Sequence, residues 1–125
     1  WISDRSEIHQ AIKAADIGLS PLPPTDIFRT NAPIKVLEYL ALETPVVVSD
    51  TPDHQTVVNG SNGGKVVKYD TAAFATAVIE LLQSKEKQDL MGVEGRNYIK
   101  NNRNFEVLTE HLICIYKSEF FNSVK

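Results

Sequence analysis

Lys35 and Glu38 are the charged residues whose types and positions are best suited to nucleotide chemistry. They lie in an apolar stretch directly after Pro33, a residue typical of the first turn of a helix. The start of a helix presents unpaired amides and the positive end of its dipole, which favour phosphate. Because Pro33 has no amide hydrogen, the donors would be those of Ile34, Lys35 and Val36.

Glu38 sits one turn further along the same predicted helix. Helical side chains lean toward the N-terminus, so its carboxylate could reach back and accept both hydroxyl protons of a ribose diol. Lys35 would add a point charge for a phosphate. The same spacing also fits an ordinary surface pair of opposite charges three residues apart. Spacing alone leaves both interpretations open.

The elements that must position this motif alternate between strand and helix. Short apolar runs bounded by turn residues predict strands at 16–20, 45–49 and 65–68. Helical spacing and capping residues predict helices at 5–15, 34–42, 52–58, 71–82, 86–101 and 105–121. The alternation predicts an α/β fold with a Rossmann-like parallel sheet flanked by helices. The β-branched strand at 45–49 should be buried on both faces.

The connections and the last helix give further expectations. The stretch 21–30 holds three prolines and should be a loop, and the glycines of 59–60 and 63–64 should form turns with positive φ. Cys114 should be a buried thiol. The apolar side of the last helix should face inward, and it consists of Phe105, Leu108, Leu112, Ile115 and Tyr116.

Ligands of open parallel sheets bind outside the carboxyl ends of the strands. Two strand-to-helix junctions fit this description, at 20–35 and 50–55. The first carries Lys35 and Glu38. The second carries His54, which is either at the rim of a pocket or an ordinary exposed polar residue.

Composition narrows the classes of function. The 125 residues are 42% hydrophobic and 23% charged, which is typical of a soluble globular domain. The formal net charge is -3, so nothing indicates nucleic acid as an obligatory partner. The single cysteine excludes an intramolecular disulfide. His9, His54 and His111 are scattered, and no metal site is expected. No apolar run approaches the roughly 20 residues that cross a bilayer.

The sequence resembles the C-terminal domain of the retaining group 1 (family 4) glycosyltransferases. The resemblance covers about residues 1–100, and the final helix fits in type without a specific motif. The matching segments follow one another in the family's order, at 15–21, 32–41, 44–49, 51–54, 57–60 and 62–64.

The resemblance implies an enzyme with two Rossmann-like domains and a cleft between them, of which residues 1–125 would be a partial C-terminal donor-binding domain ending in helices at about 86–121. Glu38 would bind the donor's ribose, and Ile34 and Lys35 would lie beside its diphosphate and sugar. The family's basic pair for the diphosphate would precede Trp1, where the chain opens without an initiator methionine. We therefore expect a part of a larger protein, inactive by itself.

Two positions depart from the family's pattern. Thr30 stands where the family has the first of two glutamates, and Pro33 stands where it has a glycine. Arg29 and Asp26 in the same loop are candidate substitutes. No catalytic residue is assigned, and the predicted nucleotide-sugar-binding residues are Thr30, Asn31, Pro33, Ile34, Lys35 and Glu38.

The function expected from the resemblance is transfer of a sugar, with retention, from a nucleoside diphosphate sugar to a polysaccharide or lipid-linked acceptor. This transfer is expected to need no cofactor and no metal. The full-length protein is expected in the cytoplasm, with attachment to the inner face of the membrane left open. A nucleotide-sugar epimerase of the same two-domain plan and a non-catalytic α/β interaction module are the alternatives. A dinucleotide-binding unit fits less well, because no G-x-G-x-x-G follows a strand.

Overall fold

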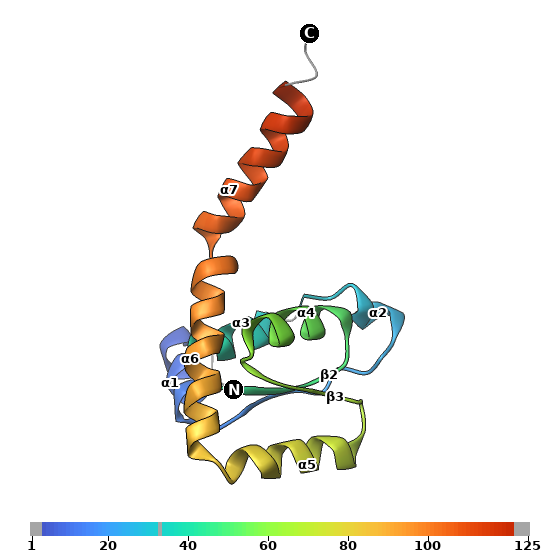
Figure 1. Cartoon of the computed structure of the whole chain (residues 1–125), viewed down its shortest axis with the longest axis vertical. Coiled ribbons are helices and arrows are strands. Elements are labelled where there is room, and N and C mark those ends of the chain that lie inside the picture. Colours follow the sequence, from blue (N-terminus) through green and yellow to red (C-terminus); the bar gives the residue numbers. More distant parts are fainter. Residues whose placement is uncertain (1–3, 33, 122–125) are drawn as a thin grey trace.

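The computed structural model describes residues 4–32 and 34–121 and has a parallel three-stranded sheet at its centre (Figure 1). The strands are β1 (Gly18–Ser20), β2 (Val46–Ser49) and β3 (Gly64–Val67), in the order β1-β2-β3. Every residue of β2 is buried, which confirms the expectation from its β-branched run. Since β2 is central, its carboxyl end lies between the ends of both neighbours.

Helices separate the strands and confirm the predicted α/β class of a parallel sheet flanked by helices (Figure 1). The bounds are α1 (Arg5–Ala14), α2 (Asp26–Arg29), α3 (Ile34–Ala41), α4 (Pro52–Ser61), α5 (Thr71–Leu82), α6 (Lys85–Asn102), α7 (Phe105–Tyr116) and a π-helical turn, η1 (Lys117–Phe121). The predicted elements occur in the expected order along the chain, with one additional short helix, α2, between β1 and α3.

The two faces of β2 contribute to separate apolar clusters. Val46 and Val48 pack with residues of α3 and α4, among them the fully buried Leu40. Val47 points to the other face and packs with Ala77 and Leu81 of α5. Figure 1 shows the same layers, with α3 and α4 on one side of the sheet and α5 on the other. A strand covered on both faces explains why its sequence is apolar without alternation.

Capping side chains fix where two helices begin. The Asp4 carboxylate accepts hydrogen bonds from the amides of Ser6 at 2.7 Å and Glu7 at 3.2 Å, at the start of α1. Asp70 accepts from the amide of Ala73 at 2.9 Å, at the start of α5. Both caps form because a short acidic side chain satisfies amides that lack a helical acceptor.

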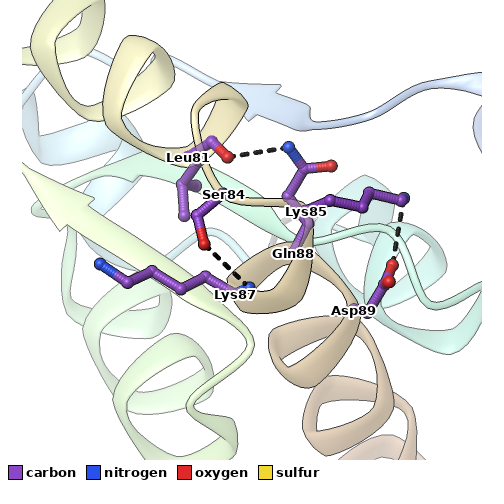
Figure 2. A network of polar contacts seen from close by, with 6 residues as sticks. All are labelled: Leu81, Ser84, Lys85, Lys87, Gln88 and Asp89. Atoms are coloured by element: carbon purple, nitrogen blue, oxygen red, sulfur yellow. Dashed lines mark hydrogen bonds and ion pairs between the residues drawn. The ribbon is translucent and has the colours of Figure 1, made fainter.

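Polar side chains also fix the turn between α5 and α6 (Figure 2). The Ser84 hydroxyl accepts from the Lys87 amide at 3.3 Å and caps α6. The buried Gln88 side chain donates to the carbonyl of Leu81 at 2.8 Å, near the end of α5. The Gln88 bond joins the start of α6 to the end of α5, and the Ser84 cap fixes where α6 begins.

Helix α6 then passes the amino ends of the strands at very short range. A side chain on Gly92 would collide with the carbonyl oxygen of Glu43, just before β2, and one on Gly95 would meet Leu40 at 2.8 Å. Arg96 adds an ion pair to Glu43 at 2.8 Å. Helix α6 therefore packs at the amino ends of the strands, opposite the carboxyl ends at which ligands of this fold class bind.

Three local predictions were wrong. The stretch 21–30 contains a helical turn, α2, after its prolines. Helix α4 continues through 59–60 to Ser61, so those residues form no turn. Among the described residues no glycine has a positive φ; Asn62, with φ 50°, supplies the left-handed conformation that ends α4 instead.

The expected inward face of α7 is wrong as well. In Figure 1 this helix extends away from the sheet beyond the end of α6. All five residues of the predicted stripe are exposed, and Phe105 is 89% exposed. Cys114 on the same helix is exposed rather than buried. Periodicity showed which side of α7 is apolar, but it carries no information about what covers that side.

Candidate functional site

The carboxyl ends of β1 and β2 meet at Ser20 and Ser49, at the edge of the sheet where ligands of this fold class bind. The connection after β1 leads through α2 to α3, and the connection after β2 leads directly into α4. Both junctions that the sequence singled out therefore lie on one edge.

His54 ties these two junctions together. Its ring is fully buried, with Nε2 3.0 Å from the Ser20 hydroxyl and Nδ1 2.8 Å from the Ser49 carbonyl oxygen. The Ser49 hydroxyl donates to the Leu22 carbonyl at 2.6 Å and accepts from the Leu22 amide at 2.9 Å. The chain after β1 is thereby fastened to the end of β2.

The hydrogen-bond partners fix the tautomer of His54. A carbonyl oxygen only accepts, so Nδ1 carries the hydrogen that Ser49 receives. In the neutral ring Nε2 then accepts the hydrogen of the Ser20 hydroxyl. Although a serine hydroxyl bonded to histidine can serve as a nucleophile, Ser20 and His54 are both fully buried and out of reach of substrate. We interpret the cluster as a positioning element.

Burial lowers the pKa of His54 below its ordinary value of 6.5, against the opposing effects of the Ser49 carbonyl bond and the Asp53 charge. The neutral form is therefore favoured more strongly in the folded protein than in the unfolded chain, and the folded state loses stability as the pH falls below 6.5 toward the lowered pKa. We expect the free energy of unfolding, measured in urea, to be smaller at pH 5.5 than at pH 7.5.

A variant isolates the contribution of His54 to this pH dependence. His54→Phe should cost about 1 to 3 kcal/mol at pH 7.5, because two buried groups lose a partner, and its stability should fall less on acidification. His111→Gln, on the exposed surface of α7, should keep the wild-type pH dependence. An unchanged slope in His54→Phe would contradict this interpretation.

The start of α3 carries the predicted nucleotide-binding side chains at the surface. Ile34 is 67% exposed, Lys35 is exposed, and the Glu38 side chain is 34% exposed. Glu38 pairs with Arg5 of α1 at 3.7 Å, rather than with Lys35 as the surface-pair interpretation would have it. The charge of Lys35 is the smallest of the effects that act on the pKa of His54, and it lowers that pKa.

The remaining predicted residues form the approach to α3. Thr30 follows α2, and both it and Asn31 are exposed. Pro33 lies outside the described residues. Thr30 and Asn31 lie on the same connection as Lys35 and Glu38, but no described hydrogen bond joins them to either.

Sequence reasoning missed part of this edge. It treated His54 as a rim or surface residue, whereas the ring is buried. It also passed over a pocket of about 270 Å³ between α2 and the start of α4, which Pro24, Arg29, Asp50, Thr51 and Pro52 line. The sequence did contain signals for these features. Ser20 and Ser49 end two strands, and Thr51 precedes Pro52 at the start of a helix.

Within residues 4–32 and 34–121, no group of three or more acidic, histidine or cysteine side chains is placed to hold a metal ion. None of the helices in this part of the chain has both the length and the apolar character needed to span a bilayer.

Comparison with known proteins gives consistent matches. The profile of the family described as "Glycosyl transferases group 1" matches residues 1–84. The putative glycosyltransferase EpsD of Bacillus subtilis (strain 168) is 30% identical over 92 residues, which cover 73% of this chain and 23% of the relative. The capsular polysaccharide biosynthesis glycosyltransferase CapM of Staphylococcus aureus is 31% identical over 83 residues, which cover 66% of this chain and 22% of the relative. The chain thus spans about a quarter of these relatives.

A solved structure shares the fold. The sucrose-phosphate synthase of Thermosynechococcus elongatus superposes with a TM-score of 0.78 at 22% identity, over 97% of this chain and 29% of that one. At this identity the match establishes the architecture, and its catalytic details are not transferred to this chain.

Proposed function

The chain belongs to the group 1 glycosyltransferases, and from this premise we propose that its protein transfers a sugar from a nucleoside diphosphate sugar to a polysaccharide or lipid-linked acceptor. The chain supplies part of the donor site, and the start of α3 is its centre. The observation that carries this proposal is the exposed Lys35 and the partly exposed Glu38 on the first two turns of α3, at the carboxyl ends of the strands.

Each group at the start of α3 has a distinct role in the proposal. The Glu38 carboxylate accepts hydrogen bonds from the two ribose hydroxyls. The amides of Ile34 and Lys35, which have no helical acceptor, donate to the diphosphate together with the Lys35 ammonium group. Thr30 and Asn31 border the donor from the connection before α3.

These groups also favour the reaction. When the bond to the sugar breaks, negative charge develops on the leaving diphosphate. Oriented amides, the positive end of the helix dipole and a lysine stabilise that charge more than the charge of the bound donor, which lowers the barrier. The proposed reaction retains the anomeric configuration and uses no metal, in keeping with the family.

The proposed acceptor class draws on the relatives. The name of the Staphylococcus aureus relative places that protein in capsular polysaccharide biosynthesis. A glycan or lipid-linked acceptor held by a second domain would meet the donor in the cleft between the domains. We propose a cytoplasmic protein that works at the inner face of the membrane, where such acceptors are assembled.

An activity assay tests this function. Full-length protein incubated with uridine or guanosine diphosphate sugars should release nucleoside diphosphate only when an acceptor is present, and the sugar should appear in the acceptor. A changed sugar configuration without acceptor would instead identify an epimerase. Failure to bind any nucleotide in calorimetry would identify a non-catalytic interaction module.

A further inference from the structure

The connection between β1 and α3, which carries Thr30 and Asn31 of the proposed donor site, has one polar anchor on the rest of the fold. The Ser49 hydroxyl holds both the amide and the carbonyl oxygen of Leu22, at 2.9 and 2.6 Å. In the described part of the chain, the other hydrogen bonds and ion pairs of this connection stay within residues 20–29. The position of the connection therefore depends on Ser49.

His54 joins this anchor to the end of β1. Its Nδ1 donates to the Ser49 carbonyl at 2.8 Å, and its Nε2 accepts from the Ser20 hydroxyl at 3.0 Å. All three side chains are fully buried, so none of them contacts a ligand. The ring can act on the donor site only through the chain, by holding the ends of β1 and β2 together beside Leu22.

Only the neutral ring makes both of these bonds. When the ring of His54 gains a proton, both nitrogens donate, so the Ser20 hydroxyl hydrogen loses its acceptor and a charge is buried between two strand ends. Two charged groups act on the ring: Asp53, which pairs with Arg103, favours the proton, and Lys35 opposes it. Burial has the largest effect and lowers the pKa of His54. Hydration of the charge would separate the strand ends and loosen the anchor.

We propose that His54 is a positioning residue of the donor site: its neutral ring holds the connection between β1 and α3 in the conformation that binds the donor, and protonation of the ring releases this connection. The inference rests on the proposed function, because it takes the donor to lie at the start of α3. Donor affinity should then fall as the pH falls. The anionic donor opposes this trend by offsetting the charge of Lys35, but Lys35 has the smallest effect on the ring.

The pH dependence of donor affinity tests the proposal in full-length protein. Calorimetry measures the Kd of uridine diphosphate glucose and of guanosine diphosphate mannose from pH 7.5 to pH 5.0, and circular dichroism checks that the protein stays folded. Sugar nucleotides are the suitable probes, because a free diphosphate ends in a phosphate that itself titrates near about pH 6. For the ligand that binds more tightly, the Kd of wild type should rise by about three- to tenfold, the size of one hydrogen bond.

His54→Gln separates this residue from every other group that titrates. The glutamine amide oxygen can take the place of Nε2 and accept from Ser20, but it gains no proton in this range. The rise in Kd should therefore disappear, whatever the affinity of the variant at pH 7.5. His111→Gln, on the exposed surface of α7, should keep the wild-type rise.

A second pair of variants tests the anchor at constant pH. Ser49→Ala removes the hydroxyl that holds Leu22, so it should weaken donor binding by about three- to tenfold at pH 7.5. Thr44→Val is the matched control, because it removes a buried hydroxyl at the other end of β2, one that donates to the Ile12 carbonyl at 3.0 Å. Both variants should unfold at lower urea concentrations than wild type, but Thr44→Val should keep the wild-type donor affinity.

Three outcomes overturn the inference alone: a wild-type Kd that does not change with pH, a rise in Kd in His54→Gln equal to that of wild type, or a Ser49→Ala protein with the donor affinity of Thr44→Val. A wild-type protein that binds no sugar nucleotide at pH 7.5 overturns the proposed function, and the inference with it.

Discussion

Replacing Glu38 by Gln should weaken binding of the donor nucleotide by about 10- to 100-fold, the effect of removing a charged partner from its hydrogen bonds. The glutamine keeps the length of the side chain and its helical conformation, but it loses the charge and one of the two accepting oxygens. Glu38 is one-third exposed, so the change should leave the free energy of unfolding nearly unaltered. Calorimetric titration of full-length protein with nucleoside diphosphates measures the effect.

Arg5→Gln is the matched control, because Arg5 is the ion-pair partner of Glu38 and its side chain is 82% exposed. Removing Arg5 breaks the same ion pair without removing the carboxylate. Donor affinity should therefore fall in Glu38→Gln and not in Arg5→Gln. Equal losses in the two variants would mean that the ion pair between α1 and α3, and not the carboxylate, supports binding.

Gly64→Ala should destabilise the fold by about 3 kcal/mol or more, or prevent folding. A methyl group on Gly64 would overlap the backbone carbonyl of Val46, the residue it pairs with on β2. The clash is with backbone, so no rotation of a side chain relieves it. Urea unfolding followed by circular dichroism measures the loss.

Gly60→Ala is the control for the glycine substitution. A methyl group there would lie closest to the Tyr98 side chain, at 3.1 Å, and Gly60 lies inside α4, where alanine is the better helix former. Its stability should stay close to that of wild type. A Gly64→Ala protein as stable as Gly60→Ala would contradict the close parallel pairing of β2 and β3.

The core of the fold was predictable because its signals are local. The run of valines in β2 needs burial on both faces, and strands that alternate with helices leave few arrangements other than a parallel sheet. The end of α4 was missed because Asn62 adopts the left-handed conformation in place of a glycine. The inward face of α7 was predicted wrongly, because the exposure of an apolar side depends on what packs against it.

The candidate site could be proposed from the sequence where its residues share one helix. Lys35 and Glu38 follow from the helix start and from the family motif. The burial of His54 was not predictable, because it depends on Ser20, 34 residues away along the chain. Similarly, Arg29 and Thr51 line one pocket only because the crossover between β1 and β2 brings two connections to the same edge.

The most direct test of the central claim asks whether Glu38 binds the ribose. Full-length wild type and Glu38→Gln are each titrated with a nucleoside diphosphate and with its 2′-deoxy counterpart. Wild type should prefer the ribonucleotide by about tenfold, the contribution of one hydrogen bond to a charged acceptor, and the preference should largely vanish in the variant. The same preference in both proteins would contradict the placement of the donor at the start of α3.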